Sequence, residues 1–547
     1  MLKNFSKAFD KSSFGVWHFL IVTILILGIF FRFTNLGQKI YWIDETFTSL
    51  RVSGYTEEEV VNQVSNAPLS SIEFIEKYQH PNAERGLMST INSLEIEDPH
   101  HPPLYYVLAR FWSELFGGSV AVMRSLPAIF SLLALPCIYW LSLELFNSSL
   151  TGWIAVLLLA ISPFQLLYAH EAREYSLWTV TILISSLAFL RAMRINTKAS
   201  WIIYAVSITI SLYTFLFTAL VGVGHGIYVV IIEKFRFTKK LLAYIFSSLL
   251  AIILFLPWVV ILINNWSHFE KAQDWITKGK SSLIYLFLTL VENISLIFFD
   301  NSSVLDPLIY KDFFRLSNLF LLGLFIYSFY LLYRKTPIKV WLFIFILTFF
   351  TSLFLLIPDL LFGGLRTAVP RYKIPTYLGV DLAVAYLLSN RLTSIANQWQ
   401  HKLWQLIIVI LISGGVLSCV TNSQAEYTWN KSLSKDLPEV TDFLNKAPSP
   451  LLIGSPTAAD LLALSYRANP KLKLLVIPQS FTVALNSPAD KQLELPKLPE
   501  GFSDVFLWKA GSYKKWLDAF EKEQKYQLKP IFSQEGKILL WKIEKSQ

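Results

Sequence analysis

The sequence predicts an α-helical polytopic membrane protein with a small α/β domain outside the membrane. Hydrophobic residues make up 54% of the 547 residues and charged residues only 16%, whereas a soluble domain carries about 25% charged residues. The mean hydropathy is +0.46, and apolar stretches of roughly 20 residues, the length that crosses a bilayer, recur along the chain. This composition excludes a disordered chain, a coiled coil and a disulfide-rich secreted domain.

Eleven stretches are long and apolar enough to be spans. The first is preceded by lysines, as a signal peptide would be, but it lacks a small-residue cleavage site, so we interpret it as a retained anchor. Two further stretches, 103–116 and 282–299, are short or carry charged residues, and counting both would give thirteen spans. The eleven predicted spans are 17–34, 121–143, 150–168, 175–192, 201–217, 218–233, 240–263, 316–333, 339–357, 374–390 and 404–420.

The positive-inside rule decides the orientation. If the N-terminus is cytoplasmic and the two ambiguous stretches lie on the outer surface, the basic turns fall inside. Counting either stretch alone as a span would invert most of them. The sequence thus predicts a multi-pass protein of the cell (plasma or inner) membrane with its C-terminus outside. The net charge of +9 is explained by basic cytoplasmic loops, so no nucleic-acid partner is expected. The basic residues concerned are Arg191, Arg194, Lys198, Lys234, Arg236, Lys239, Lys240, Arg334, Lys335, Lys339, Arg391 and Lys402.

Two hydrophilic regions lie on the predicted outer side. The first outer loop, 35–102, holds eleven acidic and four basic residues, and a loop of this length is usually functional. In residues 422–547, short apolar runs alternate with helical patterns, which is typical of a small α/β domain. We therefore divide the chain into a transmembrane catalytic domain, 1–421, and a soluble extracytoplasmic domain, 422–547.

The first candidate motif is the acidic pair Asp44 and Glu45, just outside the first span. Adjacent carboxylates near a membrane surface are costly unless they are solvated, paired or used. They could simply form the first turn of a helix, with Asp44 as its cap. Alternatively, one could be a general base that takes a proton from an acceptor hydroxyl.

The second motif ends the outer loop with His100 and His101, followed by two prolines and Tyr105. The prolines predict an extended entry and a helix start. The histidines could bind a metal, orient a substrate phosphate or lie at the interface. Because neighbouring side chains on an extended chain point to opposite sides, we expect at most one histidine to serve a given site.

The third motif, Glu171, Arg173 and Glu174, lies at the outer end of the third span. If the segment is helical, the two glutamates share a face. They could form a self-compensated turn with Arg173, or a functional cluster.

The fourth motif is basic and contains Arg366 and Arg371, with Tyr372 beside the latter. The predicted topology places it outside, against the positive-inside bias, so an anion is expected nearby. Arginine binds phosphate with a two-pronged contact, although attraction to anionic lipid headgroups is a competing explanation. Arg124, at the outer end of the second span, is the same kind of exception.

All four motifs converge on one membrane face. A transporter would instead place charges at mid-membrane in broken helices. Charges at helix ends favour an enzyme that works at the outer interface on a lipid-borne anion.

Four sequence segments together resemble a known family: WIDETFTS after the first span, HPPLYY, RSLPA at 124–128 and SPFQLLYAHEAREYSL at 162–177. They are similar to the protein O-mannosyltransferase and aminoarabinose-transferase branch of the GT-C glycosyltransferases (glycosyltransferase family 39-like). The similarity covers about the first 200 residues, and RYKIP loosely. It implies a GT-C fold and a hexosyl- or pentosyltransferase with a polyprenyl-phosphate-linked sugar as donor.

The resemblance also implies roles for individual residues. Asp44 matches the presumed base and Glu45 its acidic neighbour, while Arg124 matches an arginine near the site. The second acidic position of the family falls on Glu171 or Glu174, which leaves open whether a divalent metal ion sits there. No other cofactor is expected.

The implied chemistry agrees with these residues. Transfer with inversion leaves a lipid phosphate with extra negative charge, which Arg371 or Arg366 could stabilise. One carboxylate is enough for a single displacement. The acceptor could be a protein, a lipid or a polysaccharide. The alternatives are a transporter or flippase of a lipid-linked anionic substrate, and a membrane scaffold that presents the C-terminal domain.

Overall fold

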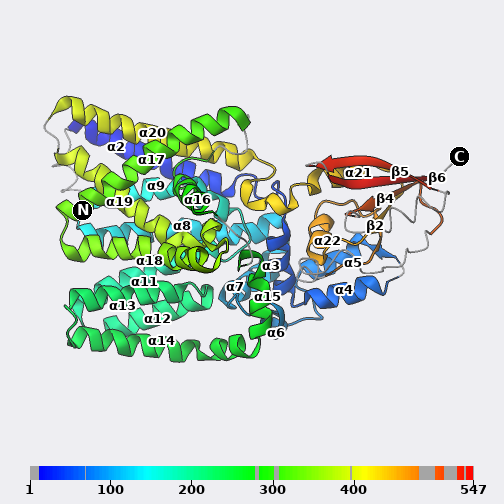
Figure 1. Ribbon diagram of the computed structural model, residues 1–547, viewed down its shortest axis with the longest axis horizontal. Helices are drawn as coiled ribbons and strands as arrows, with labels where there is room; N and C mark the ends of the chain where they lie inside the picture. The colour runs from blue at the N-terminus through cyan, green and yellow to red at the C-terminus, as the bar shows by residue number, and fades with distance from the viewer. Residues whose placement is uncertain are drawn as a thin grey trace.

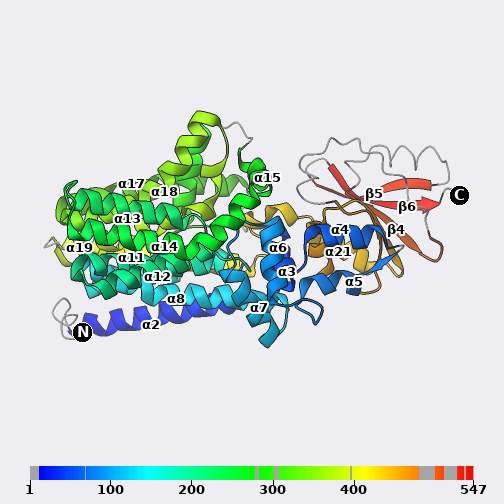
Figure 2. The same cartoon turned by 90° about the horizontal axis from the view of Figure 1, so that it is seen from below.

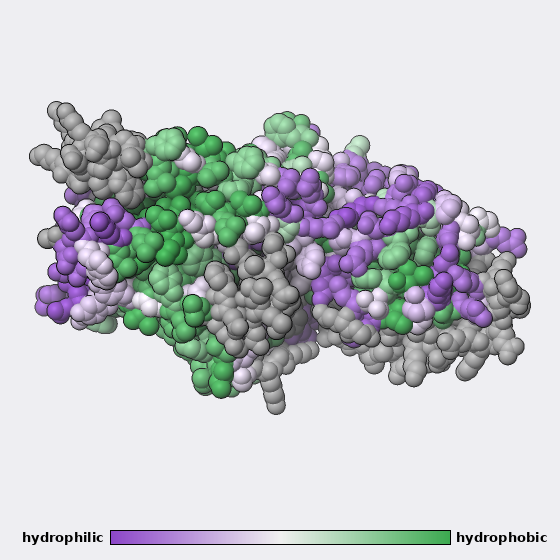
Figure 3. Space-filling view, turned by 90° about the horizontal axis from the view of Figure 1, so that it is seen from above, coloured by the Kyte–Doolittle hydropathy of each residue, from purple (hydrophilic) through white to green (hydrophobic). Residues whose placement is uncertain are grey.

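The computed structural model describes residues 11–67, 69–277, 282–300, 307–394, 397–479, 499–509, 526–534 and 537–545. A long bundle of helices forms one half of the molecule, and a sheet with short helices forms the other (Figure 1). Hydrophobic side chains gather over the bundle and hydrophilic ones at both ends of the molecule (Figure 3).

The bundle consists of helices at all eleven stretches predicted to span the membrane. The stretch 150–168 is a pair of helices, α9 and α10, bent by 57° at their junction. The bundle helices are α2 (Lys11–Phe33), α8 (Val120–Phe146), α9 (Ser149–Ala160), α10 (Pro163–Ala169), α11 (Tyr175–Ile195), α12 (Lys198–Thr214), α13 (Thr218–Ile232), α14 (Lys239–Asn264), α17 (Pro307–Lys335), α18 (Ile338–Phe362), α19 (Ile374–Ser394) and α20 (Gln398–Gln424).

Six of the described helices are long and apolar enough to cross a membrane, or seven if α9 and α10 form one span. The others are shorter or less apolar, so the number eleven stays a prediction. The ambiguous stretches form α7 (Leu104–Phe116) and α16 (Leu283–Ser295), each 13 residues long. A helix of that length spans about 20 Å, which is less than the bilayer core of about 30 Å.

The second half of the molecule is built from both hydrophilic regions. Its six-stranded sheet has the order β1-β3-β2-β4-β6-β5, in which β3, β2 and β4 are parallel. The strands are β1 (Ser70–Ser71), β2 (Pro450–Gly454), β3 (Lys473–Val476), β4 (Asp504–Trp508), β5 (Tyr526–Gln534) and β6 (Lys537–Lys545). The helices are α3 (Ile43–Ser53), α4 (Glu57–Ser65), α5 (Ile72–Glu76), α6 (Leu87–Glu97), α21 (Leu437–Lys446) and α22 (Ala458–Ser465), with the 3-10 helices η1 (Lys77–Gln79) and η4 (Trp429–Ser434).

The first outer loop and the C-terminal region share one hydrophobic core. Leu50 of α3 and Val60 of α4 lie in the same buried cluster as Leu461 of α22 and Trp508 of β4. The strand β1 from the loop also pairs with β3. Figure 2 shows α3 and α6 between the bundle and the sheet. Helix α3, which carries Asp44, is therefore held between the two halves.

Of two local expectations, one was left open and one was wrong. Residues 170–174 form a turn between α10 and α11, in which Arg173 pairs with Glu174, so the turn that we considered is present and the two glutamates do not share a helical face. The two histidines do not lie on an extended chain. The backbone N–H of His101 donates to the carbonyl of Asp98, and this turn places the His100 and His101 rings 4.2 Å apart.

Candidate active site

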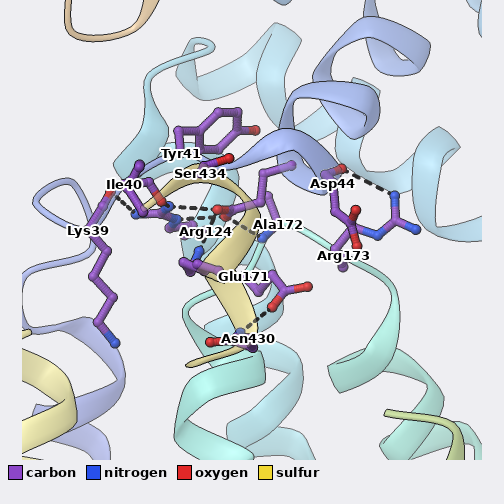
Figure 4. Close-up of polar contacts among 12 residues, drawn as sticks. Lys39, Ile40, Tyr41, Asp44, Arg124, Glu171, Ala172, Arg173, Asn430 and Ser434 are labelled. Carbon is purple, nitrogen blue, oxygen red and sulfur yellow. Dashed lines mark hydrogen bonds and ion pairs between the residues drawn. The ribbon is translucent and has the colours of Figure 1, made fainter. Parts of the chain in front are cut away.

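Glu45 is the fixed point of the site, because its carboxylate is fully buried and bonded on all sides. Figure 4 shows Arg124 and Ala172, two of the residues that bond to it. Arg124 grips it with two prongs, Nε to Oε1 at 2.7 Å and Nη2 to Oε2 at 2.7 Å. Lys431 Nζ lies 2.5 Å from Oε2, and the backbone N–H of Ala172 donates to Oε1 at 2.9 Å. Although burial alone would raise the pKa of Glu45, the charges of Arg124 and Lys431 lower it to about 2.

Arg124 has no donor left for a substrate. A guanidinium carries five N–H groups. Besides the two bonds to Glu45, Arg124 donates to the carbonyls of Leu36, Lys39 and Ile40 at 2.7, 2.9 and 2.7 Å. This arginine therefore fixes the chain between α2 and α3 onto α8.

Asp44 differs from its neighbour because its side chain is open, with 19% of it exposed. Its only ion pair among the described residues is with Arg371, at 3.5 Å from Oδ2 to Nη1. Its backbone carbonyl accepts a hydrogen bond from Arg173 Nη1 at 3.3 Å. Asp44 thus has a fixed backbone in the first turn of α3 and a carboxylate with capacity for another partner.

Arg371 is a partly buried cation with an unused donor. Its guanidinium lies over the rings of Tyr175 and Tyr372, at 5.7 Å from each centroid. Its Nε is buried and has no hydrogen-bond partner among the described residues. Because buried donors normally find an acceptor, this guanidinium is suited to receive an anion.

Arg173, Glu174 and His101 form a second ionic group beside Asp44. His101 Nδ1 lies 2.9 Å from Glu174 Oε1, and Arg173 Nη2 donates to His101 Nε2 at 2.9 Å. Arg173 Nε lies 3.5 Å from Glu174. Burial would raise the pKa of Glu174, but Arg173 and His101 lower it to about 2. His101 is thereby fixed, whereas the nearby Tyr105 hydroxyl is buried with no partner among the described residues.

Glu171 carries a free oxygen. Asn430 Nδ2 donates to its Oε2 at 2.6 Å, while the buried Oε1 has no hydrogen-bond partner among the described residues. Burial raises the pKa of Glu171 to about 7, and the charge of Glu45 adds to this, although Lys431 opposes it.

The two glutamates do not fit the metal site that we considered. Glu171 bonds to Asn430, and Glu174 to a histidine and an arginine. Across the ranges that the structure describes, no three His, Cys, Asp or Glu side chains are grouped to hold a metal ion.

Arg366 faces a different partner from the other predicted residues. Its Nη1 lies 2.9 Å from Oδ1 of Asp359, near the end of α18, and also donates to the carbonyl of Gly363. Asp359 Oδ2 in turn accepts the N–H of Thr367. This pair stabilises the loop before α19 and does not meet Asp44.

Sequence reasoning missed Lys431, Asn430 and Tyr175 as members of the site. Tyr175 lies within a motif already singled out. Lys431 and Asn430 lie a few residues after α20, which ends at Gln424. Their position near the predicted outer end of the last span was the signal that could have found them.

Comparison with known proteins agrees with the predicted resemblance. Residues 100–261 match the family model described as dolichyl-phosphate-mannose-protein mannosyltransferase. Two crystal structures of ArnT from Cupriavidus metallidurans, in the apo state and bound to undecaprenyl phosphate, match with TM-scores of 0.52 and 0.51. Each has 12% sequence identity and covers 96% of this chain and 98% of ArnT.

A further match is the oligosaccharyltransferase AglB from Archaeoglobus fulgidus, in complex with an inhibitory peptide and a dolichol-phosphate. It has 13% identity, covers 97% of this chain and 74% of AglB, and has a TM-score of 0.47, too low to carry an argument. No curated protein sequence matches the chain. The chain thus has the multi-pass helical fold of ArnT and resembles the protein O-mannosyltransferase and aminoarabinose-transferase branch of the GT-C glycosyltransferases.

Proposed function

We propose that the protein transfers a hexosyl or pentosyl group from a polyprenyl-phosphate donor to a protein, lipid or polysaccharide acceptor on the extracytoplasmic face. One observation carries this proposal. A partly exposed carboxylate, Asp44, lies 3.5 Å from Arg371, a cation whose Nε–H has no partner among the described residues. The matched family model and the undecaprenyl phosphate bound by ArnT support a lipid phosphate as the anion.

The reaction is a single displacement with inversion. Asp44 accepts the proton of the acceptor hydroxyl while the acceptor oxygen attacks the anomeric carbon. The bond from that carbon to the phosphate oxygen breaks, and its electron pair leaves with the lipid phosphate. Arg371 stabilises the charge that develops on that phosphate.

The remaining residues bind or position. His101, Arg173 and the free hydroxyl of Tyr105 contact the donor. Glu45 is too strongly ion-paired to accept a proton, so it serves by holding the first turn of α3 in place. Glu171 binds a substrate hydroxyl through its free oxygen.

The direct test is to incubate the purified protein in detergent with a panel of polyprenyl-phosphate sugars and to measure donor consumption. Transfer predicts loss of one donor and release of its lipid phosphate. In detergent no membrane separates two compartments, so a transporter would leave every donor chemically intact.

The proposed topology has eleven spans, a cytoplasmic N-terminus, and residues 35–120 and 422–547 on the outer face. Glu58 and Lys529 are exposed. We expect Glu58→Cys and Lys529→Cys both to react with an impermeant thiol reagent added to intact cells. The control Arg236→Cys, exposed at the predicted inner side, should react only after lysis. Labelling of only one of the first two would contradict this topology.

A further inference from the structure

The short helix η4, between α20 and α21, contacts the residues around Asp44 and the buried acids of the site at three points. Lys431 Nζ lies 2.5 Å from Glu45. Asn430 donates to Glu171 at 2.6 Å, as Figure 4 shows. The backbone N–H of Ile43, the first residue of α3, donates to Ser434 Oγ at 3.3 Å. A segment that is distant in sequence thus contacts the residue before Asp44, Ile43, and the residue after it, Glu45.

This segment is itself held in place. Trp429 Nε1 donates to Asp300 Oδ2 at 2.8 Å, and Thr428 Oγ1 donates to Asn430 Oδ1 at 2.5 Å. Lys431 is only 1% exposed. A buried ammonium is costly unless it is paired, and the partner of Lys431 is a carboxylate that Arg124 already neutralises. Lys431 also acts on the charge of Glu171, so it links the carboxylate of Glu45 to the second acidic group of the site.

The contacts of η4 act on the one turn that carries the proposed base. Ser434 accepts the N–H of the residue before Asp44, and Lys431 binds the side chain of the residue after it. Neither touches the open carboxylate of Asp44.

We infer that Lys431 and Ser434 are positioning residues for Asp44, so that η4, at the start of the C-terminal region, forms part of the active-site floor. This inference rests on the proposed function. It gives the C-terminal region a role in the reaction through the 3-10 helix that joins it to α20. Misplacement of a reacting group by about 1 Å can cost about 10²-fold in rate.

The first test compares Lys431→Met with Lys446→Met, which removes the same charge from an exposed position on α21. Donor affinity is measured by titration, and turnover is expressed per donor-binding site, so unfolded protein does not count. We expect Lys431→Met to lower turnover per site about 10²-fold with unchanged donor affinity, and Lys446→Met to resemble the wild type. Equal turnover per site in the two variants would overturn the inference.

The second test needs no activity. Asp44→Cys places a thiol at the partly exposed position 44, while the two native cysteines are buried. We expect this thiol to react several-fold faster in a Lys431→Met background than in a Lys446→Met background, because the first turn of α3 is released. Identical labelling rates would show that Lys431 does not position residue 44.

The two tests separate the inference from the proposed function. If the wild type consumes no donor but the labelling rate changes, the proposed transfer is wrong and the positioning of residue 44 stands. If the wild type is active and neither readout changes, the transfer stands and the role of η4 is wrong.

Discussion

The two ends of the helical bundle treat charge in opposite ways. At the end that carries Asp44, the ion pair of Glu45 and Arg124 is completely buried. At the opposite end, Arg194 pairs with Glu144 at 2.5 Å, but 62% of the arginine side chain is exposed. Exposed pairs of this kind contribute about 0–1 kcal/mol, whereas taking ions out of water costs several kcal/mol per ion.

This difference indicates which charges the protein retains for a reason other than stability. Basic residues at the exposed end are stabilised by water, and their position agrees with the positive-inside rule. The buried end keeps Arg124 and Lys431 on the carboxylate of Glu45, with Glu171 close to Lys431, and functional sites often contain such costly clusters. Substitutions at the two ends should therefore differ in the size of their effects and in whether they change turnover or stability.

The largest effect is expected at Asp44. Asp44→Asn keeps the shape of the side chain but removes its ability to take a proton, and loss of a general base costs about 10²–10⁴-fold in rate. Donor binding should survive, because Arg371 remains. Turnover and donor affinity are measured side by side, with Glu58→Gln, an exposed carboxylate on α4, as the control. Near wild-type turnover in Asp44→Asn would remove Asp44 from the reaction.

Glu45→Gln should chiefly lower stability. It leaves Arg124 and Lys431 buried without their common carboxylate, and breaking a buried pair typically costs about 3–5 kcal/mol. The matched variant at the exposed end, Glu144→Gln, should cost about 0–1 kcal/mol. Thermal unfolding of both variants in the same detergent measures the difference. Equal shifts in Tm would mean that burial of the first pair has no energetic consequence.

Arg371→Lys keeps the charge but loses the planar fork and the unused Nε–H. If Arg371 grips the donor phosphate, the lysine variant should need at least about tenfold more donor for half-maximal rate, which corresponds to about 1.4 kcal/mol. Arg366→Lys serves as the control, because its partner is Asp359. An unchanged donor dependence in Arg371→Lys would leave the phosphate without its proposed partner.

The sequence predicts the helices well because their signal is local. A run of apolar side chains indicates a helix wherever it lies, and all eleven stretches fall on helices of the bundle. Residues Asp44, His101, Arg173 and Arg371 do come together, because all were placed at one end of the predicted spans.

The details of the site depend on contacts between distant residues, which local patterns do not contain. Lys431 meets Glu45 across 386 positions of sequence, and no periodicity reports such a pairing. Arg366 looked equivalent to Arg371, but Asp359, seven residues before it, provides a nearer anion. The sequence left helix and turn open at 170–174, because the i, i+3 spacing of the two acids occurs in both.

The pH dependence of stability should reveal Glu171. Its pKa is raised to about 7 by burial, so the folded protein holds this proton more tightly than the unfolded chain does. The stability that this group contributes is complete below about pH 4.5 and is lost as the pH rises through 7. Glu45 and Glu174, whose pKa values are lowered, change stability only below about pH 4.5. As the pH is raised from 5 to 8, the Tm of the wild type should therefore fall relative to the Tm of Glu171→Gln. Parallel Tm curves would place the titration elsewhere.

The smallest effect is expected at the opposite end of the bundle, where a substitution serves as the control for the comparison of the two ends. Arg194→Met breaks the pair with Glu144, but the arginine is 62% exposed and already solvated, and the Glu144 side chain keeps 13% of its surface open to water. Stability should change by less than about 1 kcal/mol, and turnover and donor affinity should match the wild type, because Arg194 lies at the far end of α11 from Tyr175. High salt should leave even this small difference undetectable, since exposed pairs are screened. A loss of turnover in Arg194→Met with unchanged Tm would show that charge at the exposed end also serves the reaction, and the division between the two ends would then be wrong.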